Sequence, residues 1–226
     1  MIVASLPENL ARVRARIGSV QVAEGISGDV RIVAVTKGHA VAAVEAARAA
    51  GVMDVGENRV QEALDKQDEA PPDLRWHLIG HVQTNKARLV PGRFAMVHSV
   101  DSVRLAAALD RAAQGSRLPV LLQVNVAGEA QKSGCPPEIA DEVLAHIGTM
   151  SSLAVTGLMT MAPFTADERL QRQVFGSLRR LRDRLATTDR PLRELSMGMS
   201  DDFPAAVAEG ATILRLGTVL FGARGG

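Results

Sequence analysis

The stretch RIVAVTK, from Arg31 to Lys37, is the first of several short apolar runs and shows the pattern that the others repeat. Its β-branched residues predict a buried strand, and the polar pair Thr36-Lys37 marks the strand's carboxyl end. Longer Ala/Leu-rich stretches of helical period separate this run from the next ones. Such alternation is typical of βα units around a parallel sheet, so the fold class is α/β.

Eight runs of this kind predict eight strands, which suggests a closed barrel. The runs are Arg31 to Val35, Met53 to Val55, Arg75 to Ile79, Met96 to Val100, Pro119 to Asn125, Ala154 to Leu158, Glu194 to Met197 and Thr212 to Leu216. The span is about 23 residues per unit, close to the minimum for a strand, a helix and two short loops. We therefore expect one domain, 1–226, folded as a single (β/α)8 TIM-type barrel. Leu6 to Val22 predicts an extra amphipathic helix before the first strand.

Composition excludes several classes of protein. The net charge is +1 and the Lys and Arg residues are scattered, which disfavours nucleic acid as a partner. Because no run of 18 uncharged apolar residues occurs, we expect no signal peptide and no membrane span. Cys135 is the one cysteine, so no intrachain disulfide can form, and we expect a cytoplasmic monomer. The arginine-rich segment Asp167 to Leu185 fits a solvated helix face better than an anionic partner site.

Polar residues gather where the predicted strands end. The expected ends carry Thr36-Lys37, Gly56-Glu57-Asn58, Gly80-His81, Asp101, Asn125, Met159-Thr160, Ser196 to Asp202 and Gly217-Thr218. In a parallel barrel these ends form one rim, where reactive side chains lie. Helix capping by residues such as Asp101 and Asn58 explains about half of the convergence.

Lys37 is the candidate nucleophile at this rim. Desolvation at a barrel mouth lowers a lysine pKa, and a neutral amine can form a Schiff base with a carbonyl compound. Anion binding by a charged Lys37 is the alternative, and the residue alone does not decide between them.

The loops after the last two predicted strands favour a phosphate site. Small residues let the backbone approach a ligand, Ser200 precedes a predicted helix from Asp202 to Glu209, and amides at Gly217 and Thr218 can cradle a phosphate. In the alternative, Ser200 is a plain N-cap and Gly217 a tight turn.

Arg215 is predicted inside the last strand, where a buried guanidinium needs an acceptor. That acceptor is either a ligand or a neighbouring carboxylate such as Glu57, and residue types leave both open. His77 and His81 have the i, i+4 spacing of a helical metal pair, but they flank a strand end and would not share a face. We expect no metal site, with His77 in the core or in a loop and His81 at the rim.

Several motifs together resemble one family. They are Ala34-Val35-Thr36-Lys37, Gly56 to Glu62 (GENRVQE), Trp76 to Gly80 (WHLIG), Gln83 to Lys86 (QTNK), Gly157-Leu158-Met159, Ser196 to Asp202 (SMGMSDD) and Arg215 to Thr218 (RLGT). From about Arg31 to Arg224 the chain resembles the YggS/PROSC family of pyridoxal phosphate (PLP) homeostasis proteins. Two departures, Gly38-His39-Ala40 after the lysine and His81 where proline is usual, alter the outer rim but not the residues of the cofactor site.

The resemblance implies PLP as cofactor and assigns a role to each site residue. Lys37 forms the Schiff base, and Arg215 faces the pyridine nitrogen. The phosphate is held by Ser200, Gly217 and Thr218, and the pocket is lined by Asn58 and Met199. A second PLP site at Lys86 or Lys132 stays open.

The resemblance also implies a protein that holds PLP in vitamin B6 homeostasis without turnover, in transient contact with PLP-dependent apo-enzymes. An arginine opposite the pyridine nitrogen stays charged and supplies no proton, which weakens the ring as an electron sink. The related alanine racemase takes its second base, a tyrosine, from another domain, and this chain has no tyrosine. A racemase-like PLP enzyme is the alternative function, and a Schiff-base aldolase ranks last.

Overall fold

The computed structural model describes residues 6–129 and 133–222, which form a closed barrel of eight parallel strands. The strands are β1 Arg31–Val35, β2 Asp54–Glu57, β3 Arg75–Leu78, β4 Met96–Val100, β5 Leu118–Gln123, β6 Leu153–Met159, β7 Glu194–Ser196 and β8 Ile213–Leu216. Each strand pairs with the next, and β8 returns to pair with β1. The expected TIM-type barrel is confirmed.

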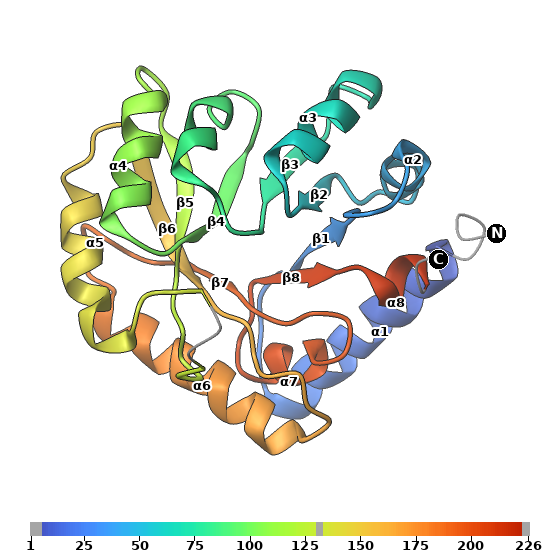
Figure 1. Cartoon of the computed structure of the whole chain (residues 1–226). Coiled ribbons are helices and arrows are strands. Elements are labelled where there is room, and N and C mark those ends of the chain that lie inside the picture. Colours follow the sequence, from blue (N-terminus) through green and yellow to red (C-terminus); the bar gives the residue numbers. More distant parts are fainter. Residues whose placement is uncertain (1–5, 130–132, 223–226) are drawn as a thin grey trace.

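Helices connect successive strands and surround the barrel (Figure 1). The α-helices are α1 Leu6–Glu24, α2 Val41–Ala49, α3 Val60–Glu69, α4 Val103–Ala112, α5 Ala140–Gly148, α6 Glu168–Leu185, α7 Phe203–Ala208 and α8 Thr218–Phe221, with the 3-10 helices η2 Thr84–Leu89 and η3 Pro137–Ile139. The described residues contain no helix with the length and apolar character that a membrane crossing requires.

The predicted helix before the first strand is confirmed as α1, which continues two residues beyond Val22 to Glu24. Its buried side chains recur every three or four residues, as an amphipathic helix requires: Leu6, Leu10, Val13, Ile17 and Val20. α1 lies against α7 and α8, at the end of the chain (Figure 1). Asn9 Nδ2 donates to the carbonyl oxygen of Leu220 over 2.8 Å, which ties the two ends together.

Two apolar clusters hold the barrel. The larger one fills the space between strands and helices, while a small one of Val33, Met96, Leu121, Met159 and Ile213 lies apart from it. In a closed barrel the side chains of alternate residues point inward, so we assign the small cluster to the interior. It fills only part of that interior, and polar side chains occupy the rest.

Strand bounds differ from the predicted ones by at most two residues, with β1 and β4 unchanged and the largest shifts at β2 and β5. The prediction of Met53 to Val55 ended before Gly56-Glu57, yet both residues pair in register with His77-Leu78 of β3. Sequence pattern stops a strand at a charged residue, whereas Glu57 is fully buried here. The predicted helix Asp202 to Glu209 is α7, with Asp202 and Glu209 as its caps.

Three arginines of α6, Arg172, Arg179 and Arg182, make ion pairs within the molecule. Arg172 pairs with Glu24 of α1 and Glu209 at the end of α7, and Arg179 also reaches Glu209. These contacts favour a structural role for the arginines of this helix face over an anionic partner site.

Candidate functional site

Lys37 lies one residue beyond the buried Thr36, in the turn that follows β1, and is half-buried. Gly38 has a positive φ of 70°, which a residue with a side chain rarely adopts, so glycine closes this turn. The lysine therefore emerges at the carboxyl end of the barrel, as predicted.

A cluster of buried and partly buried charged side chains holds this turn. Lys66 of α3 donates from Nζ to Glu57 Oε1 (2.6 Å), to Glu62 Oε1 (2.9 Å) and to the carbonyl oxygen of Thr36 (2.8 Å). The hydroxyl of Thr36 donates to Glu57 Oε1 over 2.6 Å. We name Lys66, Glu57 and Glu62 the lysine clamp.

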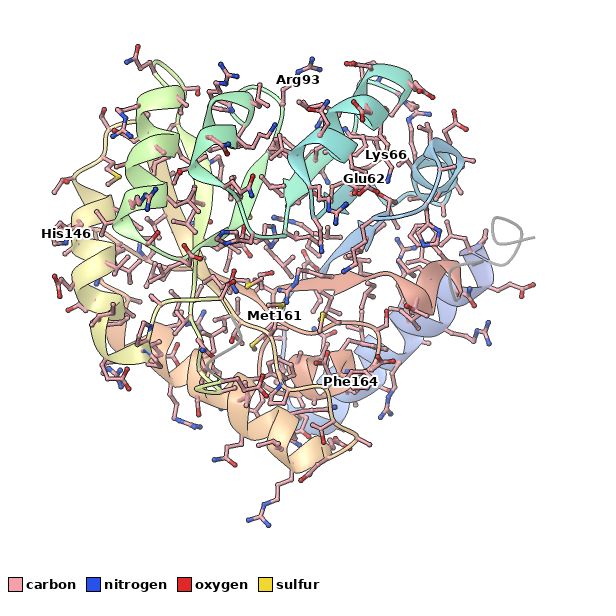
Figure 2. All side chains as sticks on the ribbon, in the orientation of Figure 1. Glu62, Lys66, Arg93, His146, Met161 and Phe164 are labelled. Atoms are coloured by element: carbon pink, nitrogen blue, oxygen red, sulfur yellow. The ribbon has the colours of Figure 1, made fainter. Side chains whose placement is uncertain are left out.

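The clamp also contacts the residue after Lys37. The amide of Gly38 donates to Glu62 Oε1 over 2.6 Å, so both neighbours of Lys37 are fixed by the same cluster. Figure 2 shows Glu62 and Lys66 together on α3, which packs beside β2. The backbone that carries Lys37 is therefore anchored by charge-assisted hydrogen bonds.

Burial and hydrogen bonding together shift the pKa values of the two clamp carboxylates in opposite directions. Burial raises the pKa of Glu57 above its usual range, although hydrogen bonds from Lys66 and Thr36 oppose the shift. At Glu62 burial also raises the pKa, but hydrogen bonds from the Gly38 amide and Lys66 lower it by a larger amount. The net shift of the Glu62 pKa is therefore downward. Glu57 Oε2 is buried without a hydrogen-bond partner in the described part of the chain.

Ser200 lies in the loop after β7, and its hydroxyl faces the start of α8. The amides of Gly217 and Val219 each donate to Ser200 Oγ over 3.2 Å. The alternative in which Ser200 caps the following helix is wrong, because Asp202 occupies the N-cap position of α7. Ser200, Gly217 and the exposed Thr218 thus lie together, as the sequence predicted.

Met199 lies on the same loop, with 37 % of its surface exposed. Its amide donates to Asp202 Oδ1 over 2.5 Å, which fixes the loop on its inner side. At Gly198, φ is +94° and an added Cβ would approach Ala206 Cβ to 2.5 Å. The loop between β7 and α7 therefore packs closely against the barrel and has one preferred shape.

Arg215 lies in β8 and is only 4 % exposed. Its Nη1 donates to Ser196 Oγ (2.7 Å) and its Nη2 to the carbonyl oxygen of Thr160 (2.9 Å). The suggested pairing with Glu57 is wrong, because Glu57 is held by Lys66 on the far side of β1. Burial lowers the pKa of Arg215 to about 10, opposed by the charge of Asp202, so the guanidinium is protonated at neutral pH.

Asn58 is half-buried and lines a cavity of about 340 Å³ beside α3. The other lining residues are Arg59, Val60, Gln61, His81, Gln83 and Lys86. Asn58 does not cap α3, whose N-cap is Arg59. An added Cβ at Gly80 would approach the carbonyl oxygen of Asn58 to 2.3 Å, so only glycine fits beside it.

His81 is exposed beyond β3, and its Nδ1 lies 3.4 Å from Asp101 Oδ2. Asp101 does not cap α4, since Ser102 holds that position and accepts from the amide of Leu105. His77 is buried and hydrogen-bonds to Asp54 and His98, so its predicted place in the core is confirmed. In residues 6–129 and 133–222 no group of three or more His, Cys, Asp or Glu side chains is arranged to hold a metal ion. Lys132 lies outside the described residues.

Cys135 makes an isolated bridge beside β5, at the edge of the barrel mouth. Its amide donates to the carbonyl oxygen of Gln123, and its own carbonyl oxygen accepts from the amide of Asn125. The thiol is 3 % exposed, and burial raises its pKa to about 12.

Sequence reasoning missed the lysine clamp and the contacts of Ser196. One signal for the clamp existed, because Glu62 and Lys66 have the i, i+4 spacing of a helical ion pair. No local signal joins Ser196 to His98, which are 98 residues apart and meet across the barrel.

A barrel of this kind, with these side chains at the carboxyl ends of its strands, is similar to proteins of known families. A family model described as "Alanine racemase, N-terminal domain" matches residues 6–225. The Pseudomonas aeruginosa pyridoxal phosphate homeostasis protein is 46 % identical over 97 % of this chain and 96 % of its own. The Escherichia coli protein of the same name is 37 % identical over 97 % of each chain. The chain therefore belongs to the family of pyridoxal phosphate homeostasis proteins.

Solved structures agree with this assignment. The structure of PipY from Synechococcus elongatus with PLP bound has a TM-score of 0.83 and 39 % identity, covering 96 % of this chain and all of that one. The alanine racemase of Clostridium difficile shares the fold at 16 % identity with a TM-score of 0.75, over 97 % of this chain and 58 % of the racemase.

Proposed function

We propose that this protein binds PLP as a Schiff base on Lys37 and acts in PLP homeostasis without catalytic turnover. The observation that carries the proposal is the placement of Arg215. It is a buried, protonated guanidinium for which no carboxylate within salt-bridge distance is found among the described residues. A buried charge of this kind needs a polar partner, which an aromatic nitrogen with a lone pair supplies.

The other groups that PLP needs lie on neighbouring strands. Arg215 pairs in register with Val33 of β1, four residues before Lys37, and Ser200 follows β7 on the other side of β8. An amine, a guanidinium and a cluster of hydroxyl and amide donors match the aldehyde, the ring nitrogen and the phosphate of PLP. Asn58 and Met199 complete the pocket in this proposal, with Gly217 and Thr218 beside Ser200.

PLP supplies an electrophilic aldehyde and an electron-withdrawing ring, and Lys37 holds it reversibly through the imine. A guanidinium with a pKa of about 10 donates a hydrogen bond to the ring nitrogen but does not transfer its proton near pH 7. We therefore expect no racemisation, transamination or decarboxylation at ordinary enzyme rates, on the order of 1 per second. A racemase-like activity above that rate would place the protein among the enzymes.

The proposal has a direct spectroscopic test. Protein mixed with PLP should show a visible absorption band, and borohydride should fix the cofactor on the peptide that contains Lys37. Lys37→Ala should lose both signals and keep its fold, because contacts of Thr36 and Gly38 hold the turn. Lys86→Ala, a lysine of the neighbouring cavity, is the matched control and should keep both.

A reduced adduct on another lysine in place of Lys37 in the wild type would refute the assignment of Lys37. We further propose that the chain works as one cytoplasmic domain and as a monomer, and that it passes PLP to apo-enzymes through transient contacts. Size-exclusion chromatography with light scattering tests the oligomeric state, and transfer of PLP to a purified apo-enzyme tests delivery.

A further inference from the structure

Five polar side chains form a continuous hydrogen-bonded chain through the barrel interior. They are Arg215 of β8, Ser196 of β7, His98 of β4, His77 of β3 and Asp54 of β2, and we name them the interior relay. Each is at most 5 % exposed. The set joins five of the eight strands, and apart from Arg215 its members lie beyond the residues that contact PLP in the proposed function.

Each step of the relay has the length of a good hydrogen bond. Arg215 Nη1 donates to Ser196 Oγ over 2.7 Å, and Ser196 Oγ lies 2.8 Å from His98 Nδ1. His98 Nε2 lies 2.9 Å from His77 Nδ1, and His77 Nε2 lies 2.9 Å from Asp54 Oδ1. Asp54 is the first residue of its strand, so the relay reaches the opposite end of the barrel from Lys37.

Asp54 is an ionised carboxylate. Arg75 donates to it from Nε (2.8 Å) and Nη2 (2.6 Å), in addition to the bond with His77. Burial raises the pKa of Asp54, but the hydrogen bonds of His77 and Arg75 lower it more, and the net pKa lies far below its ordinary value of 3.8. Asp54 therefore only accepts hydrogen bonds.

With one proton on each imidazole, these two ends fix the direction of every bond between them. Asp54 accepts, so His77 carries its proton on Nε2 and accepts at Nδ1, and His98 must then donate from Nε2. His98 Nδ1 is left as an acceptor for the hydroxyl of Ser196, whose oxygen accepts from Arg215. All donors then point from the guanidinium toward the carboxylate, and each singly protonated imidazole is the Nε2–H tautomer. Burial lowers the pKa of His98 well below its ordinary value, in agreement with a neutral ring.

The relay answers the question of what holds Arg215 in place. The nearby carboxylate of Asp202 acts on its charge, but the described residues place no carboxylate in contact with the guanidinium. We propose that Ser196, His98, His77 and Asp54 are positioning residues that orient Arg215 toward the pyridine nitrogen of PLP. Buried hydrogen bonds that all point one way polarise one another, so the negative charge of Asp54 reinforces the bond at Ser196.

This inference rests on the proposed function for its ligand, whereas the relay itself can be tested without PLP. In the cofactor-free protein labelled with 15N, the ring signals of His77 and His98 should report Nε2–H tautomers. The guanidinium signals of Arg215 should show slowed rotation and slowed proton exchange. Ser196→Ala should abolish that slowing, whereas Ser196→Thr, which keeps a hydroxyl, should restore it.

The effect on the cofactor is tested with the same variants loaded with PLP. Ser196→Ala should shift the absorption maximum and weaken PLP binding by about 10-fold. Asp54→Asn keeps the shape but removes the charge, and should shift the same band although Asp54 contacts no cofactor. Glu194→Gln is the matched control: this carboxylate lies on β7, two residues before Ser196, and bonds to Thr212 outside the relay.

The outcomes separate the two proposals. An Nδ1–H tautomer on either histidine, or an Asp54→Asn spectrum identical to that of the wild type, would overturn the inference. Equal shifts in Asp54→Asn and Glu194→Gln would also overturn it, since both would then report a general loss of charge. If the wild type gives the predicted NMR signals but no band with PLP, the proposed function fails and the assigned ligand of Arg215 with it, whereas the hydrogen-bonded chain stands.

Discussion

At the scale of single residues, Ser200 shows how one hydroxyl can act in two ways. It already accepts hydrogen bonds from the amides of Gly217 and Val219. Its own proton therefore points away from those amides and can be donated to a phosphate oxygen. Ser200 would then hold both the phosphate and the loop that carries the other donors.

We expect Ser200→Ala to weaken PLP binding by about 1.5 to 3 kcal/mol, or roughly 10-fold to 150-fold. The loss combines one charge-assisted hydrogen bond with the acceptor that fixes the start of α8. Titration of PLP against the variant measures this change. Pyridoxal, which lacks the phosphate, should bind the wild type far more weakly and should be almost insensitive to the substitution. Equal binding of pyridoxal and PLP would show that the phosphate lies elsewhere.

At the scale of elements, the lysine clamp joins α3 to the ends of β1 and β2. Lys66 is buried between Glu57 and Glu62, so removal of its charge leaves Glu57 buried and uncompensated. Breaking one partner of such a pair costs far more than the pair contributes as a whole.

We therefore expect Lys66→Met to lower the free energy of unfolding by about 3 to 5 kcal/mol, measured by urea denaturation. The double variant Lys66→Met with Glu57→Gln should recover part of that loss, because no buried charge is left without a partner. Glu62→Gln should cost much less, since Glu62 is partly exposed to water. A double variant no more stable than Lys66→Met alone would contradict this account.

The elements were predictable from the sequence to a greater extent than the contacts between them. Alternating apolar runs indicated eight strands in the observed order, because local pattern reflects burial. The end of β2 was missed because Glu57 is charged, and the structure buries it only with the help of Lys66. The clustering of Ser200 with Gly217 and Thr218 followed from the rule that strand ends meet. His98 and Ser196 carried no such signal, since their contact depends on the closure of the barrel.

At the scale of the whole molecule, the polar interior couples stability to pH. Burial keeps His98 neutral by lowering its pKa well below 6.5, with the charges of Arg215 and Arg31 acting in the same direction. Below about pH 6.5 the unfolded chain binds a proton that the folded chain does not. The free energy of unfolding should therefore fall as the pH drops from 7 toward 5.

One such histidine gives a slope of up to about 1.4 kcal/mol per pH unit. Denaturation of the wild type across this range should show the slope, and His98→Gln should flatten it. His146, an exposed residue of α5 labelled in Figure 2, offers the control: His146→Gln should leave the slope unchanged. An equal slope in all three proteins would assign the acid sensitivity to other groups.

The buried Cys135 offers a built-in measure of local opening of the barrel. A thiol with a pKa of about 12 and 3 % exposure reacts with alkylating reagents only while the segment beside β5 is detached. The labelling rate therefore measures how often that wall of the barrel opens, without an engineered cysteine. If PLP closes the barrel mouth, saturating the protein with PLP should slow the alkylation of Cys135. An alkylation rate that PLP leaves unchanged would mean that this wall opens independently of the ligand.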